Sequence, residues 1–300
     1  MTLRHYKIFI AVCDSRNMTS AAERLYISQS AVSQTISELE RNYNVKLFER
    51  LTKKLYITKA GERLLGYARH IISLNLAAEN EMRELQDSGY LRIGSSITIG
   101  AYVLPSLISK YKTLYPKTDV EVFVDNTEKI ENMILMDKVD IGVIEGVLTS
   151  KELYETTFMD DELVLICNNT HKFSHMHCIS APELETEHFV IREQGSGTRK
   201  IFEAVMSANN VKWNPIWTCN NTDAIKMAVI EGIGVSVISK RAISQELLNG
   251  TIRIIPINEF NFKRNFKISY HKNKFISSYM KGFINLCNDS KIQKSDFCNE

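Results

Sequence analysis

The sequence predicts an α/β protein built in three parts: a helical N-terminal segment that ends in a short hairpin, one long helix, and a region of alternating strands and helices. Apolar residues recur every three or four positions through residues 19–43 and again through 59–85, as they do along one face of an α-helix. From residue 91 onward, short apolar runs alternate with amphipathic stretches, which is the pattern of an α/β sheet.

The first predicted feature is a pair of helices joined by a short turn. The Thr19 hydroxyl is expected to cap the first helix, and the small residues Ala21 and Ala22 would let a second helix cross it closely. Ser28 is expected to cap the second helix. The predicted buried face of that second helix comprises Ala31, Val32, Ile36, Leu39 and Tyr43. This arrangement is typical of a helix-turn-helix.

The other face of the second helix is polar and uncharged. Its N-terminal turns present Gln29, Ser30, Ser33 and Gln34. In a helix-turn-helix, the first residues of the second helix contact base edges in the major groove, and Gln can pair with adenine through both amide atoms. These four side chains are therefore predicted to read DNA.

A small basic hairpin, the predicted wing, follows this helix. Arg50, Lys53 and Lys54 surround a turn that leads into the strand 55–57. Residues 1–58 contain nine Lys or Arg against five Asp or Glu, a net charge of +4, although the whole chain carries only +2. This concentration of positive charge predicts contacts from Arg50 and Lys53 to the phosphates of double-stranded DNA. The alternative is an ordinary solvated basic face.

These segments resemble the N-terminal domain of LysR-type transcriptional regulators. The likeness runs from Leu3 to Gly61 and includes Thr19–Ala22, Ser28–Ser33, Leu47–Arg50 and Thr58–Gly61. The resemblance implies a winged helix-turn-helix, a long linker helix for dimerisation, and a C-terminal effector domain of two α/β subdomains, similar to periplasmic solute-binding proteins. It also implies that the chain is not an enzyme and acts in the cytoplasm as a homodimer or homotetramer, with RNA polymerase as a further candidate partner.

The same resemblance carries the family's DNA contacts onto particular positions of this chain. Those positions are Gln29, Ser30, Ser33, Gln34 and Lys53. Two of them depart from the family pattern, since many members have Pro at the position of Ser30 and Arg at that of Gln34. The preferred base is therefore left open.

The linker is predicted as one helix from the cap Thr58 to about Leu85. Its apolar face comprises Leu64, Leu65, Ala68, Ile71, Ile72, Ala78, Met82 and Leu85. A long helix with one apolar side needs a partner, which the resemblance implies is the same helix of a second subunit; packing on its own C-terminal domain is the alternative. The expected division is 1–58 for the DNA-binding domain, 59–87 for the linker and 88–300 for the effector domain, with subdomain I at about 88–161 and 266–300 and subdomain II at about 162–265.

The C-terminal region is predicted to form doubly wound α/β halves. Strands are expected at 91–94, 120–124, 140–144, 162–167, 189–191, 235–238 and 266–270, with helices at 102–115, 127–137, 198–209 and 222–231. Such sheets bind ligands beyond the carboxyl ends of their strands, where helix N-termini favour anions. Three loops of this kind provide Ser96 and Thr98, Ser196 and Thr198, and Thr222.

Each of these five residues could simply cap a helix, because Ser and Thr are common helix caps. The resemblance favours a role in ligand binding, since the effector of this family lies between the two subdomains. The runs Ser96–Pro105 and Glu193–Arg199 look most like the branch of the family that senses anionic metabolites. We therefore expect a small anionic metabolite as effector, with no cofactor.

Two rival functions are weighed against this one. The chain has no G-x-S-x-G, H-E-x-x-H or phosphate-binding Gly-rich loop motif, which argues against an enzyme. A metal-responsive regulator could use the loop that holds His171, His175, His177 and Cys178, although its spacing fits no common zinc motif. The six cysteines form no C-x-x-C pair, and no apolar run is long enough to cross a membrane, so a reduced protein of the cytoplasm is expected.

Overall fold

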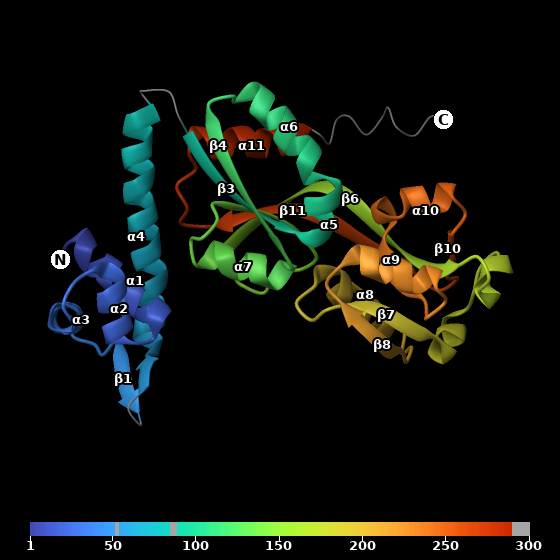
Figure 1. The fold of residues 1–300 in the computed structure, drawn as a ribbon, viewed down its shortest axis with the longest axis horizontal. Helices are drawn as coiled ribbons and strands as arrows, with labels where there is room; N and C mark the ends of the chain where they lie inside the picture. The colour runs from blue at the N-terminus through green and yellow to red at the C-terminus, as the bar shows by residue number, and fades with distance from the viewer. Residues whose placement is uncertain (52–53, 85–88, 290–300) are drawn as a thin grey trace. The chain divides into compact units, whose positions relative to one another are not determined.

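The computed structural model describes residues 1–51, 54–84 and 89–289 (Figure 1). The chain forms two compact units. One is built mainly from Met1–Gly89, and the other from Tyr90–Ile134, Lys138–Lys272 and the segment that begins at Ser278. The two units are described separately below.

The N-terminal unit is a winged helix-turn-helix followed by a long helix, as predicted. Its elements are α1 (Leu3–Ser15), α2 (Met18–Leu25), α3 (Gln29–Tyr43), the antiparallel pair β1 (Phe48–Leu51) and β2 (Lys54–Ile57), and α4 (Lys59–Glu84). Phe9, Val12, Ala21, Val32 and Leu39 are fully buried where the first three helices cross. The small side chain of Ala21 lets α2 and α3 approach closely.

The caps of the two helix-turn-helix helices differ in part from the prediction. Asn17, not Thr19, caps α2: its side-chain oxygen accepts hydrogen bonds from the backbone N–H groups of Thr19 (2.8 Å) and Ser20 (3.3 Å). Thr19 lies inside the first turn because the helix begins earlier than predicted. Ser28 caps α3 as predicted, accepting from the Ala31 N–H at 3.2 Å.

Helix α4 begins after Thr58, as expected, and the Thr58 hydroxyl accepts from the Gly61 N–H at 3.0 Å. Its predicted apolar face is divided between two environments. Leu64, Leu65, Ala68 and Ile72 pack against the core of α1–α3. Of the other predicted residues, Ile71, Ala78 and Met82 are exposed and Leu85 lies outside the described residues. The apolar side chains of Tyr67, Leu74 and Leu76, which were not part of the prediction, are also exposed. The linker helix therefore has one apolar side covered by its own domain and a second apolar side open.

The effector unit contains a mixed sheet in the strand order β10-β6-β11-β5-β3-β4, with β9 also paired to β6. Its first half consists of β3 (Gly89–Ser96), α5 (Ile97–Tyr102), α6 (Leu104–Leu114), β4 (Thr118–Asp125), α7 (Thr127–Leu135), β5 (Ile141–Glu145) and α11 (Ser278–Asp289). Its second half consists of β7 (His188–Arg192), α8 (Gly197–Ala208), β8 (Asn214–Cys219), α9 (Thr222–Ile230), β9 (Ser236–Ser239), α10 (Ser244–Leu248) and β10 (Ile252–Ile254). The α/β class of the prediction is confirmed.

Two strands are much longer than predicted and connect the halves. Strand β6 runs from Leu153 to Asn168 and β11 from Phe262 to His271, and they pair antiparallel along the whole of β11. The predicted strands covered only one end of each. The remaining parts contain the charged residues Asp160, Asp161, Lys263 and Arg264, which interrupt the apolar pattern of a strand. The halves are therefore joined by a shared pair of strands.

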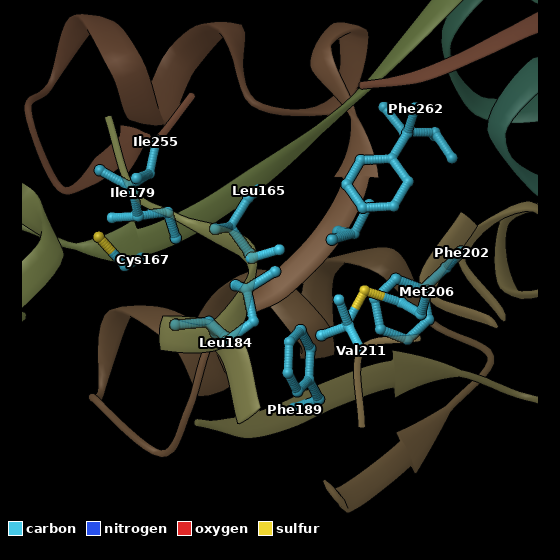
Figure 2. Packing of buried hydrophobic residues seen from close by; sticks show 14 of the residues in the cluster. Leu165, Cys167, Ile179, Leu184, Phe189, Phe202, Met206, Val211, Ile255 and Phe262 are labelled. Carbon is cyan, nitrogen blue, oxygen red and sulfur yellow. The ribbon is translucent and has the colours of Figure 1, made fainter. Parts of the chain in front are cut away.

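The second half has an aromatic core that supports the N-terminus of α8 (Figure 2). Phe189 on β7 and Phe202 on α8 are buried, with ring centroids 5.2 Å apart, and Met206 packs beside them. Phe262 from β11 completes this cluster, with its ring 6.0 Å from that of Phe202. The start of α8 is thereby held against the connecting strands.

Within the described ranges, no helix has the length and apolar character needed to cross a membrane. The cysteines in the same ranges are free thiols: Cys13, Cys167, Cys178, Cys219 and Cys287. Cys298 lies outside the described residues.

Candidate functional site

The predicted DNA-contacting residues of α3 lie at the surface of the N-terminal unit. Gln29, Ser30 and Gln34 are exposed and Ser33 is half-buried. The Ser30 hydroxyl lies 2.9 Å from that of the cap Ser28, which holds it at the first turn of the helix. They lie in the first turns of the second helix, the part of a helix-turn-helix that generally faces base edges, which agrees with the prediction without testing it.

Glu40 connects the recognition helix to the wing. One of its carboxylate oxygens accepts from the backbone N–H groups of Leu47 (2.9 Å) and Phe48 (3.3 Å), and the other lies 2.8 Å from the Lys46 ammonium. Burial acts to raise the pKa of Glu40, but these hydrogen bonds outweigh it and lower the pKa. Arg50 lies on β1, but its side chain, like the whole of Lys53, lies outside the described residues.

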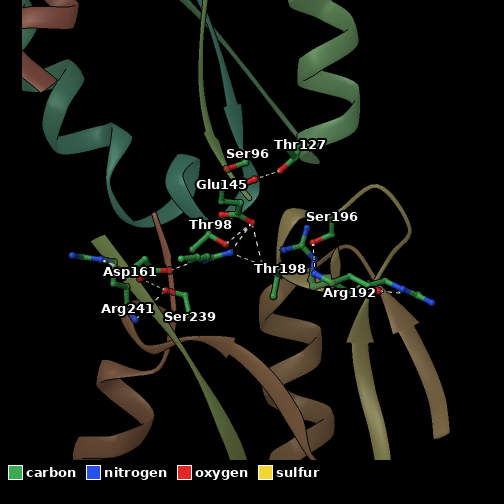
Figure 3. Close-up of polar contacts among 12 residues, drawn as sticks. Ser96, Thr98, Thr127, Glu145, Asp161, Arg192, Ser196, Thr198, Ser239 and Arg241 are labelled. Atoms are coloured by element: carbon green, nitrogen blue, oxygen red, sulfur yellow. Dashed lines mark hydrogen bonds and ion pairs between the residues drawn. The ribbon is translucent and has the colours of Figure 1, made fainter. Parts of the chain in front are cut away.

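The predicted effector-binding residues of the first two loops lie at two helix N-termini that face each other (Figure 3). Ser96 is the N-cap of α5, and Ser196 is the N-cap of α8, where its hydroxyl accepts from the Arg199 N–H at 3.4 Å. Thr98 and Thr198 lie in the first turns of the same helices, and all four are buried. One helix belongs to each half of the effector unit, so the two loops meet as predicted.

The two threonines share one acceptor that the sequence did not point to. Thr98 donates to Glu145 Oε1 at 3.2 Å, and Thr198 donates to the same oxygen at 3.1 Å (Figure 3). Glu145 is the last residue of β5 and is only 1% exposed. The hydroxyls predicted to hold an anion from outside therefore hold a carboxylate of the chain itself.

A buried arginine balances this carboxylate. Arg264 on β11 has an Nη1 atom 3.2 Å from Glu145 Oε1, and the same Nη1 donates to the Thr198 hydroxyl at 2.8 Å. Its Nε donates to Asp161 Oδ2 at 2.6 Å. Asp161 in turn accepts from the Ser239 hydroxyl at 2.9 Å. We call Thr98, Glu145, Asp161, Thr198 and Arg264 the buried polar cluster.

Three polar atoms of this region lack a hydrogen-bond partner among the described residues. They are Ser96 Oγ, Glu145 Oε2 and Arg264 Nη2, and all three are buried. An unpaired buried polar atom costs about 1–3 kcal/mol, so such atoms favour binding of a molecule that pairs with them. The three offer a hydroxyl, a carboxylate oxygen and a guanidinium N–H. They could pair with a small oxyanion that also carries a hydrogen-bond donor.

Glycine allows the halves to approach closely beside the cluster. A Cβ atom on Gly197 would lie 2.3 Å from the Glu145 carbonyl oxygen and 2.8 Å from the Thr127 hydroxyl. Gly195 has a φ of +85°, and its carbonyl oxygen accepts from the Glu128 N–H at 3.1 Å. The start of α8 is thus placed directly on the end of β5, which brings Thr198 to Glu145.

Thr222, the fifth predicted residue, is the first residue of α9 and is buried. It makes no described contact with the buried polar cluster, and Asn221 caps its helix by accepting from the N–H groups of Asp223 and Ala224. Sequence reasoning missed Glu145, Asp161 and Arg264. The only sequence signal for Glu145 was its position at the end of an apolar strand, before the turn at Gly146.

The alternative metal site gains no support from the His-rich loop. The His171 ring accepts from the Phe173 N–H through Nδ1 (3.2 Å), and its Nε2 lies 3.2 Å from Glu187. Both ring nitrogens are therefore used within the protein. Among the described residues, no group of three or more His, Cys, Asp or Glu side chains is arranged to hold a metal ion.

Comparison with known proteins matches each of the two units to a protein family model. A model described as the bacterial regulatory helix-turn-helix protein of the lysR family matches residues 3–62, and one described as the LysR substrate binding domain matches residues 85–291. The chain is 37% identical over 266 residues to the transcriptional regulator CysL of Bacillus subtilis, which covers 88% of this chain and 88% of the relative.

Two solved structures are similar to the chain. The regulatory domain of Synechocystis CcmR in complex with 2-PG has a TM-score of 0.65 and 26% identity, covering 69% of this chain and 99% of that one. A full-length OxyR from Pseudomonas aeruginosa has a TM-score of 0.70 over 97% of this chain and 94% of its own, at 20% identity, and so shares the fold.

Proposed function

We propose that a small oxyanion is the effector of this protein, which belongs to the LysR family of DNA-binding transcriptional regulators. A small oxyanion would bind at the buried polar cluster and change the way in which α5 and α8 meet. The observation that carries this proposal is the shared acceptor: Thr98 and Thr198, from different halves, both donate to Glu145 Oε1. A ligand that takes over these hydroxyls must alter the contact between the halves.

The effector would be held by the hydroxyls of Ser96, Thr98, Ser196 and Thr198 and by the guanidinium of Arg264. Thr222 at the start of α9 stays a further candidate. Glu145 restricts the ligand, because a fully deprotonated anion beside a buried carboxylate would be repelled. We infer that the effector carries at least one proton or N–H group that can donate to Glu145 Oε2. The similar CcmR regulatory domain is in complex with 2-PG, which supports a small ligand in the effector unit of this chain.

On the DNA side, Gln29, Ser30, Ser33 and Gln34 would contact base edges, and Arg50 and Lys53 would contact phosphates. The open apolar side of α4 supports a homodimer through paired linker helices, and two dimers could form a tetramer on a longer site. Two recognition helices would then lie in successive major grooves of a partly palindromic site. Such a protein would act in the cytoplasm, where an effector that changes DNA bending could alter access of RNA polymerase.

The experiment is thermal unfolding of the full-length protein in inorganic phosphate, which keeps a proton near neutral pH, with fully deprotonated sulfate as the comparison that should stabilise less and glycerol as an uncharged control. A ligand at a hundred times its dissociation constant stabilises by about 2.7 kcal/mol. Thr198→Val should abolish the stabilisation, whereas Thr113→Val, at an exposed position on α6, should retain it. Stabilisation that persists in Thr198→Val would place the ligand elsewhere, and no stabilisation by any of the anions would count against an anionic effector.

A further inference from the structure

The side chain of Gln34 is held by a hydrogen-bond chain that reaches back to the start of the protein. Gln34 Nε2 donates to Glu38 Oε1 at 2.9 Å, one turn further along α3. The other carboxylate oxygen of Glu38 lies 3.1 Å from His5 Nε2 on α1. The carboxylate of Glu38 therefore joins a residue of the recognition helix to a neighbouring helix.

The state of His5 follows from its second ring nitrogen. The backbone N–H of Thr2 donates to His5 Nδ1 at 3.2 Å, and the Thr2 hydroxyl lies 2.8 Å from the same atom. Because Nδ1 accepts, Nε2 carries the hydrogen and donates to Glu38. Both hydrogen bonds lower the pKa of Glu38, the one from Gln34 more than the one from His5, and they keep the carboxylate ionised. An ionised carboxylate can only accept, so it must face the NH₂ side of the Gln34 amide.

This contact fixes which atoms of Gln34 remain for DNA. With one N–H bound to Glu38, the amide still has its carbonyl oxygen and its second N–H. Adenine offers an amino group to such an oxygen and its N7 to such an N–H, whereas guanine offers two acceptors and thymine an acceptor and a methyl group. Cytosine offers only the amino group.

We propose that Glu38 is a positioning residue that orients the Gln34 amide and thereby makes adenine the preferred base at the position that Gln34 contacts. This inference rests on the proposed role of Gln34 as a DNA contact. Glu38 itself does not touch the base in this arrangement. Gln29 is an internal comparison, because its exposed side chain has no hydrogen bond among the described residues and its amide can turn either way.

The experiment is selection of binding sites from a random-sequence DNA duplex pool by the full-length protein, followed by sequencing. Wild type is compared with Gln34→Ala, Glu38→Ala and Glu38→Gln. Glu38→Gln replaces one carboxylate oxygen by an NH₂ group, so the side chain at position 38 can donate as well as accept and no longer dictates which side of the Gln34 amide faces it. Glu23→Ala is the matched control, since it removes an exposed acid of the same domain without touching Gln34. The midpoint of thermal unfolding is recorded for every variant to confirm folding.

We expect one position at which wild type prefers adenine by about tenfold. Gln34→Ala, Glu38→Ala and Glu38→Gln should all reduce that preference to about twofold or less at the same position, while Glu23→Ala keeps it. If Gln34→Ala changes the profile but Glu38→Ala does not, or if Glu38→Ala weakens all sequences equally, the positioning role is wrong and the DNA contact stands. If Gln34→Ala leaves the profile unchanged, the proposed base contact itself fails.

Discussion

The face of α3 that is proposed to contact DNA and the buried polar cluster hold their polar groups in opposite ways. On α3 the groups are exposed, and Gln34 is bound by a residue only four positions away. In the cluster they are buried, and Arg264 is bound to Asp161 across 103 positions of the chain. The first arrangement needs only a helix, whereas the second forms only when both halves of the effector unit are folded and in contact. On the proposed roles, a ligand of the cluster would act on tertiary structure, while DNA would meet a surface that is already formed.

The largest effect is expected for Arg264→Ala, which would leave the buried Glu145 without its cationic partner and Asp161 with only Arg241, whose Nε lies 3.4 Å from Asp161 Oδ1. Breaking a buried ion pair by removing one member costs about 3–5 kcal/mol. Urea unfolding followed by circular dichroism of the full-length protein would measure it. Arg253→Ala, at an exposed arginine of β10, is the control and should change the free energy of unfolding by less than about 0.5 kcal/mol. Equal stability of the two variants would mean that the cluster is not coupled to folding.

The same contrast explains what could be predicted from the sequence. Helical periodicity was sufficient to predict α3 and most of its two faces, because both depend on neighbours within two turns, although Tyr43 of the predicted buried face is exposed and Ser33 of the predicted exposed face is half-buried. Ser96 and Thr198 were found because helix N-termini follow strands in an α/β fold. Arg264 was missed because it lies among basic residues that look like a solvated surface, and its partners come from distant strands. Pairing across long separations leaves no periodic pattern in the sequence.

A second prediction concerns base discrimination by the exposed site. Gln29→Ala should reduce discrimination at the base pair that Gln29 contacts by about 1–3 kcal/mol, while binding to other sequences changes little. Binding to duplexes with single base-pair substitutions, measured by fluorescence anisotropy, would detect it. The free energy of unfolding should stay the same, because the side chain is exposed. An equal loss of affinity across all substitutions would show that Gln29 does not read a base.

A third prediction tests the connection between α3 and the wing. Glu40→Gln should destabilise the N-terminal unit by about 1 kcal/mol at neutral pH, because the charge-assisted hydrogen bonds from Lys46 and the Leu47 N–H are weakened. The lowered pKa of Glu40 makes this contribution full above the ordinary Glu pKa of about 4.3 and progressively lost as the pH falls through the lowered value. The stability difference between wild type and variant, measured by thermal unfolding, should therefore vanish in acid. A difference that is independent of pH would contradict the proposed role of the charge.

The smallest effect is expected for Lys53→Ala in the predicted wing, which tests whether phosphate contact and base contact are separate functions of the DNA-binding unit. Loss of one phosphate contact weakens binding to all sequences alike and lowers the slope of log affinity against log salt by about 1. Affinity for one selected site and one scrambled duplex, measured at several salt concentrations, gives both quantities. The ratio of the two affinities should stay unchanged in Lys53→Ala. Gln29→Ala should change this ratio and leave the slope of log affinity against log salt unchanged. If Lys53→Ala also changed the ratio, the wing would take part in reading the sequence, because a phosphate contact carries no base information.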